Sequence, residues 1–117
     1  MTGILREITV KELSDLMRAD NQFTILDVRE EWELTYAQIK DKRVLNIPMS
    51  RIGQNLKEAF PLELQQPEAE IVVLCHHGVR SANVAVWMMQ NGWQNVSSLE
   101  GGIAAYAMEI DHSVGEY

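Results

Sequence analysis

The stretch from residue 71 to residue 81 constrains the fold of this chain more than any other part of its sequence. It reads Ile-Val-Val-Leu-Cys-His-His-Gly-Val-Arg-Ser and holds the only cysteine, Cys75. The four β-favouring apolar residues before Cys75 are typical of a strand that is covered on both faces. Gly78 permits a positive φ, and helix-compatible residues follow from 81 to 91. The stretch therefore predicts a buried strand, a tight turn and a helix.

A turn of this kind, from strand to helix, is a predicted anion-binding loop. Free backbone N–H groups and the positive end of the helix dipole point into it. A cysteine in such a place is favoured as thiolate, the reactive form, and an arginine adds a permanent positive charge. We therefore expect Cys75 to be a nucleophile, surrounded by a loop made of His76, His77, Gly78, Val79, Arg80 and Ser81.

Length and charge narrow the class of protein. The 117 residues fit one domain, spanning 1–117, and carry a net charge of −7 with a pI near 4.8. An acidic chain has no general attraction to nucleic acid or anionic lipid, so we expect neither as a partner. The sequence shows no apolar run of the ~20 residues that a membrane span needs and no apolar signal-peptide core near its start. One cysteine cannot form an internal disulfide, so we expect a cytoplasmic protein, or one free in an organelle after processing.

The remaining sequence predicts strands and helices in alternation. Strands are expected at residues 23–28, 44–47, 71–74 and 96–99, and helices at 10–18, 30–36, 51–59, 81–91 and 103–108. Thr9 and Glu12 match a capping box, and Ser50 is expected to cap helix 51–59. The polar, proline-containing segment 61–70 is expected to be a surface connection. This order predicts an α/β fold with a mostly parallel sheet, helices on both faces, and ligands beyond the carboxyl ends of the strands.

Four motifs in this order resemble those of the rhodanese family. They are Leu-Asp-Val-Arg-Glu at 26–30, Val-Leu-Asn-Ile-Pro at 44–48, the loop at 75–81, and Leu-Glu-Gly-Gly-Ile at 99–103. The resemblance covers about residues 8–117. It implies the single-domain form of the family, with a central five-stranded sheet.

The resemblance also implies a chemistry. Cys75 would take a sulfane sulfur from a donor such as thiosulfate, become a persulfide, and pass the sulfur to cyanide, a thiol or a protein. No metal or organic cofactor is implied. Where typical users of thiosulfate carry arginine or lysine, this loop has His76 and His77. That difference favours a less charged donor, such as a persulfide or a partner protein.

Two other functions remain open from the sequence. The first is a binding module that keeps the fold but recruits a partner without turnover. The second is a phosphatase or arsenate reductase, which is disfavoured because the related phosphatases have one more residue between cysteine and arginine. A metal site at the cysteine and the two histidines is also disfavoured, since adjacent ligands rarely converge on one ion.

Two charged residues outside the loop are secondary candidates for the site. Asp27 and Arg29 follow a predicted strand and are expected to form an ion pair at the start of the next helix. Arg29 is also a candidate for the rim of the pocket. The tryptophans at 32, 87 and 93 are expected to be core or partly buried aromatic residues.

Overall fold

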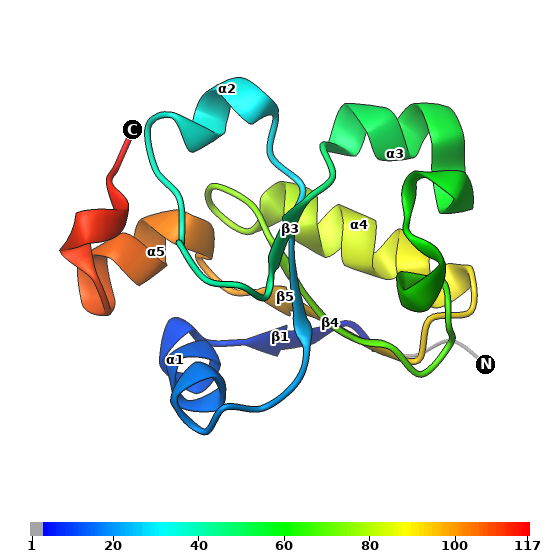
Figure 1. Ribbon diagram of the computed structural model, residues 1–117, viewed down its shortest axis with the longest axis horizontal. Helices are drawn as coiled ribbons and strands as arrows, with labels where there is room; N and C mark the ends of the chain where they lie inside the picture. The colour runs from blue at the N-terminus through cyan, green and yellow to red at the C-terminus, as the bar shows by residue number, and fades with distance from the viewer. Residues whose placement is uncertain (1–3) are drawn as a thin grey trace.

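The computed structural model describes residues 4–117, which form one sheet with helices packed around it (Figure 1). The strands are β1 (Arg6–Ile8), β2 (Thr24–Asp27), β3 (Val44–Asn46), β4 (Glu70–Leu74) and β5 (Asn95–Leu99). The α-helices are α1 (Val10–Arg18), α2 (Glu31–Leu34), α3 (Met49–Asn55), α4 (Val79–Gln90) and α5 (Gly102–Glu109). Short 3₁₀ helices are η1 (Leu56–Ala59), η2 (Leu62–Leu64) and η3 (His112–Val114).

The sheet is five-stranded, with the order β1-β5-β4-β2-β3. Every strand pairing in it is parallel. The predicted α/β class is therefore confirmed, and the sheet is parallel throughout rather than mostly so. The most hydrophobic strand, β4, lies between β5 and β2, as its unbroken run of apolar residues predicts.

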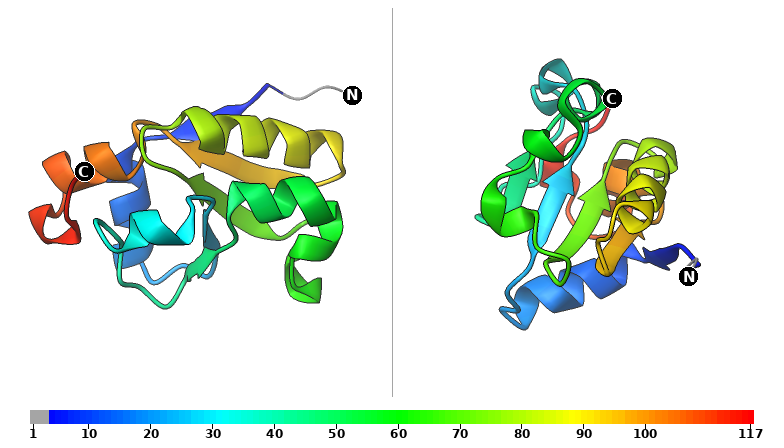
Figure 2. Two further views of the ribbon diagram at one scale, coloured as in Figure 1. Left: turned by 90° about the horizontal axis from the view of Figure 1, so that it is seen from above. Right: turned by 90° about the vertical axis from the view of Figure 1, so that its right-hand side faces the viewer.

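Helices cover both faces of the sheet because successive strand residues point to opposite sides. On β4, Ile71 and Val73 pack with the buried side chains of α3 and α4, whereas Val72 and Leu74 pack with those of α1 and α5. The two further views separate these layers (Figure 2). Cys75 continues the alternation and belongs to the layer that contains α3 and α4.

Several elements differ from the expectation. The helix predicted to start after Ser50 starts one residue before it, at Met49, with Pro48 as N-cap. Ser50 is not the cap, because its hydroxyl group donates to Glu30 Oε1 at 2.8 Å instead. The helix ends at Asn55, and a 3₁₀ turn follows where Leu56 takes a positive φ of 54°. The edge strand β1 was not predicted, since two of its three residues are charged.

Two aromatic predictions have opposite outcomes. Trp32 is 61% exposed, so its expected burial is wrong. Trp93 is buried, and its Nε1 donates to the carbonyl oxygen of Leu64 at 2.6 Å. The segment 61–70 contains Leu64 and is therefore anchored to the core through η2, in addition to connecting α3 with β4.

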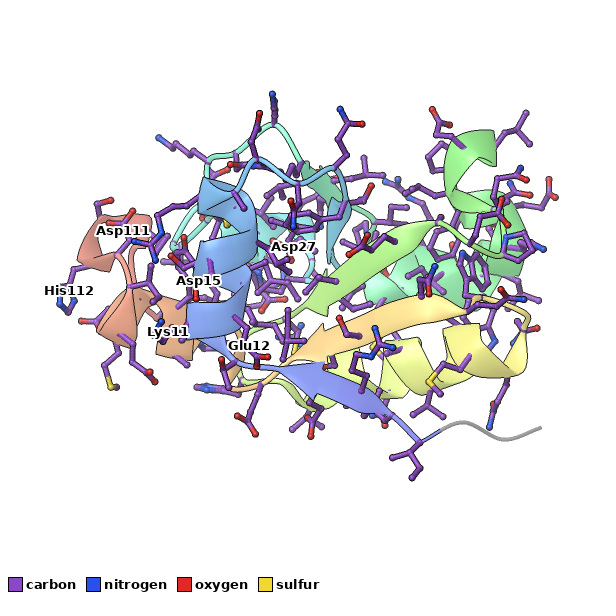
Figure 3. All side chains as sticks on the ribbon, turned by 90° about the horizontal axis from the view of Figure 1, so that it is seen from below. Lys11, Glu12, Asp15, Asp27, Asp111 and His112 are labelled. Atoms are coloured by element: carbon purple, nitrogen blue, oxygen red, sulfur yellow. The ribbon has the colours of Figure 1, made fainter. Side chains whose placement is uncertain are left out.

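The register of the strands brings their carboxyl ends to one edge of the sheet. Asp27 pairs with Leu74, and Val73 with Ser98, so the chain leaves β2 and β4 side by side. The Asn46 side chain donates to the Asp27 carbonyl oxygen at 2.8 Å and fixes the end of β3 beside them. Figure 3 shows Asp27 within the body of the molecule, in contrast to His112, which points outward from the C-terminal segment. Cys75, the first residue after β4, thus begins its loop at this edge.

Candidate active site

Cys75 follows the central strand directly and is only 1% exposed. Its Sγ accepts hydrogen bonds from the backbone N–H of Gly78 at 3.1 Å and of Ser81 at 3.2 Å. The Ser81 hydroxyl oxygen lies 3.4 Å from Sγ. In turn, that oxygen lies 2.8 Å from the hydroxyl oxygen of Ser98, which comes from the neighbouring strand β5. The sulfur is thus surrounded by donors that stabilise a negative charge on it.

The loop keeps this shape because its backbone is held from the other side by α5. The N–H groups of Ile103 and Ala104, in the first turn of α5, donate to the carbonyl oxygens of Cys75 (2.9 Å) and His76 (3.0 Å). Those carbonyl groups therefore face α5, while the N–H groups of Gly78 and Ser81 face the sulfur. Gly102 permits this approach, because a Cβ at that position would lie 2.5 Å from the Cys75 carbonyl oxygen.

Gly78 supplies the turn that the sequence predicts. Its φ is 102°, a conformation that residues with a side chain rarely adopt. A Cβ there would also come within 3.1 Å of the backbone nitrogen of Gly101. The next residue, Val79, is 70% exposed and begins α4.

The positive charge of Arg80 is compensated by a carboxylate from another element. Its two terminal nitrogens bind the carboxylate of Glu33 in α2, at 2.7 and 2.8 Å. The side chain of Glu33 is 4% exposed and that of Arg80 is 34% exposed. Hydrogen bonds from Arg80 lower the pKa of Glu33 to about 2, and the pair raises the pKa of Arg80 in return. Arg80 therefore ties the end of the loop to α2 as one half of an ion pair.

The two histidines lie in an aromatic stack. The rings of His76 and His77 are 3.8 Å apart, and the ring of Tyr117 lies 3.7 Å from His76 on its other side, at an angle of 7°. His77 is exposed and His76 is half-buried. Burial, followed by the nearby His77, lowers the pKa of His76 from its ordinary value of 6.5. His76 is therefore mainly neutral at pH 7.

Asp27 and Arg29 form the ion pair that the sequence suggests, and both are buried. Arg29 is 0% exposed, and its Nη2 lies 2.7 Å from Asp27 Oδ2. Its Nη1 donates to the hydroxyl oxygen of Tyr117 at 3.1 Å. Arg29 thus reaches the site through Tyr117 and not through exposure at the rim of a pocket.

Three residues of the site escape an analysis of the sequence alone: Glu33, Ser98 and Tyr117. The sequence does predict a tight turn and close packing at Gly101 and Gly102, and Gly102 packs closely against the loop backbone. Glu33 and Ser98 lie 47 and 17 positions from the loop residues they contact. The one weak signal for Glu33 is that a loop arginine often pairs with a carboxylate. Nothing in the sequence marks Tyr117.

Within residues 4–117, the structure contains no group of three or more histidine, cysteine, aspartate or glutamate side chains placed to hold a metal ion. In the same part of the chain, no helix combines the length and the apolar character needed to cross a membrane.

The sequence of this chain matches a known protein family over most of its length. The family model described as "Rhodanese-like domain" matches residues 9–109. A tRNA uridine(34) hydroxylase of Erwinia tasmaniensis is 31% identical over 91 residues, which are 78% of this chain and 25% of that protein. The chain spans between about a quarter and two fifths of the curated relatives that it matches first, with values of 25% and 38%.

Solved structures of the same fold cover most of the chain. SSP1007 from Staphylococcus saprophyticus has a TM-score of 0.72 and 30% identity, over 91% of this chain and 97% of that one. An NAD-dependent persulfide reductase from A. fulgidus has a TM-score of 0.63 and 31% identity, over 87% of this chain and 16% of that one. The chain is thus similar both to a protein of nearly its own extent and to one part of a larger enzyme.

Proposed function

Because the chain belongs to the rhodanese-like domain family, we propose that it is a sulfurtransferase that carries a sulfane sulfur on Cys75. One observation carries this proposal: two backbone N–H groups, from Gly78 and Ser81, donate to Sγ at the end of the central strand. Donors fixed in this way stabilise a negative sulfur without reorganising during the reaction. The persulfide reductase among the structural relatives supports the same class of chemistry.

The proposed cycle has two displacement steps. In the first, the Cys75 thiolate attacks the outer sulfur of the donor, a new S–S bond forms, and the donor's S–S bond breaks. The donor leaves with that electron pair, as sulfite from thiosulfate or as a thiolate from an organic persulfide. In the second step, the acceptor attacks the outer sulfur, and Cys75 leaves as the thiolate. Neither step needs an oxidant, a reductant or a metal.

The loop residues have separate roles in this proposal. Gly78 and Ser81 stabilise the sulfur directly through their N–H groups. The Cys75 thiol donates to the Ser81 hydroxyl oxygen, and once Cys75 is a thiolate this hydroxyl group can donate to the sulfur instead. Arg80 anchors the end of the loop through Glu33. His76, His77 and Val79 form the part of the loop that faces solvent, where donor and acceptor arrive. Asp27 and Arg29 support this arrangement from the interior.

The proposed partners are a small sulfur donor and a thiol, cyanide or protein acceptor. The name of the Erwinia relative suggests tRNA as a candidate substrate. The net charge of −7 does not favour binding of such a polyanion by this chain. A single free cysteine that works as thiolate suits a reducing compartment, so we propose a cytoplasmic location.

Intact-protein mass spectrometry tests the carrier role. The protein is incubated with thiosulfate, and separately with a small organic persulfide, before and after addition of cyanide. We expect a gain of one sulfur atom on the wild type, its loss to cyanide, and no gain on Cys75→Ser. A folded, reduced protein that gains no sulfur from either donor would refute the proposal and favour a binding module. Hydrolysis of an aryl phosphate or reduction of arsenate would instead favour the third function.

A further inference from the structure

Tyr117 joins parts of the chain that are far apart in sequence at one side of the catalytic loop. Its hydroxyl group donates to Glu33 Oε1 at 2.8 Å and accepts from Arg29 Nη1 at 3.1 Å. Its ring stacks on His76. The phenol thus bridges the two ion pairs next to the loop, while the ring covers a loop histidine.

The preceding segment fixes the place of Tyr117. The N–H of Gln38 donates to the carbonyl oxygen of Val114 at 2.9 Å. Gly115 has a φ of 98° and packs so tightly against Tyr36 that a Cβ would collide with its carbonyl oxygen. The chain therefore turns at Gly115 and directs Tyr117 over His76.

The charges around this side of the loop are compensated. Arg80 is paired with Glu33, and Arg29 is paired with Asp27. The charged groups that act on the pKa of His76 are His77 from its own loop and Arg80 from α4, which lower it, and Glu33 from α2, which raises it. A hydrogen bond with the backbone of Tyr117 also raises this pKa, and that backbone remains when the Tyr117 side chain is removed. Since burial keeps His76 mainly neutral, an anion that approaches Cys75 past this histidine meets no added positive charge from it.

We propose that Tyr117 is a positioning residue whose ring covers His76 beside the loop, and that it thereby selects weakly charged organic persulfides over the dianion thiosulfate as sulfur donors. The proposal rests on the sulfurtransferase function proposed above and names its donor class. Removing the ring exposes His76 to water, so His76 gains its positive charge at a higher pH. Anionic reagents should then reach Cys75 more readily, and most clearly in mildly acidic buffer.

Alkylation of Cys75 tests the effect without requiring sulfur transfer. The rate with iodoacetate, an anion, is divided by the rate with neutral iodoacetamide at pH 6 and pH 8, and the ratio is normalised to a free thiol. For Tyr117→Ala we expect the ratio to rise at least about threefold at pH 6, as one added charge nearby implies. At pH 8 the rise should be much smaller. The matched control is Trp32→Ala, which removes an exposed aromatic ring that packs edge-on against Tyr36.

Two results would overturn the proposal: a ratio equal to that of the wild type at both pH values, or a rise that is the same at both. Circular dichroism checks the fold, and Tyr117→Leu replaces Tyr117→Ala if the smaller residue unfolds the protein. With an active enzyme, Tyr117→Ala should also raise the rate with thiosulfate relative to an organic persulfide. Failure of sulfur loading in the wild type, together with the expected alkylation ratios, would refute the proposed function but leave the role of Tyr117 standing.

Discussion

Replacing Glu33 by glutamine should destabilise the protein by about 2 kcal/mol at neutral pH. The pKa of Glu33 falls from 4.5 to about 2, chiefly through hydrogen bonds from Arg80. A difference of about 2.5 pH units corresponds to about 3.4 kcal/mol. Because Arg80 is 34% exposed, solvent screens the pair and reduces the expected contribution to about 2 kcal/mol. The loss of Glu33 should thus weaken the attachment of the loop to α2.

The sign of the pH dependence makes this prediction specific. A carboxyl group whose pKa is lowered on folding stabilises the protein fully above its unfolded value of 4.5, and this stabilisation is lost as the pH falls toward 2. Urea unfolding, followed by tryptophan fluorescence at pH 7, 5 and 3, should therefore show a difference between wild type and Glu33→Gln that shrinks at pH 3. Glu31→Gln, at an exposed site 3.8 Å from Arg51, should change stability by roughly 0.5 kcal/mol or less. A difference that stays constant from pH 7 to pH 3 would show that the ion pair is not its cause.

Three further variants address the loop. Gly102→Ala should destabilise by about 2 kcal/mol or more in thermal unfolding, because its Cβ would collide with the loop backbone at a positive φ; Gly53→Ala, with open space around it, should be neutral or stabilising by about 0.5 kcal/mol. Ser81→Ala should slow alkylation of Cys75 at neutral pH by about three- to tenfold, since the hydroxyl group that can donate to the thiolate is lost; an unchanged rate would exclude that role of the hydroxyl group. His76→Arg should improve the use of thiosulfate and make it more sensitive to salt; no gain at low salt would count against the account of donor choice.

The architecture and the place of Cys75 in a loop of backbone donors could be predicted because their signals are local. The apolar run at 71–74, Cys75 and Gly78 lie within eight consecutive residues, and each acts through its own backbone conformation or its burial. The capping box of Thr9 and Glu12 was predicted for the same reason. Ser50 failed as a cap because Glu30, twenty positions away, competes for its hydroxyl group. A helix cap can be predicted from neighbouring residues only when no distant side chain binds the capping hydroxyl group.

The surroundings of the loop could not be predicted, because they depend on which side chains the fold brings together. Glu33 lies on a four-residue helix whose sequence gives no reason to face the loop. Tyr117 contacts Arg29 across 88 positions of sequence. Ser98 is one of two adjacent serines on β5, and only the register of the sheet decides which one approaches Ser81. These partners become visible only once the fold is known.

Backbone and side chains contribute differently to the chemistry of the site. The donors that hold the sulfur belong mainly to the backbone, so a chain that preserves the strand, the glycine and the turn preserves the capacity to stabilise a negative sulfur. Under the proposed function, the charge that a sulfur donor meets would be set by side chains from other elements, namely the carboxylate that binds Arg80 and the ring that covers His76. Two chains with the same loop sequence can therefore differ in donor when these partners differ. Changes at Glu33 and Tyr117 should accordingly alter donor preference and stability more than the proposed ability of Cys75 to carry sulfur. Changes at Gly78 should abolish sulfur loading and also destabilise the protein.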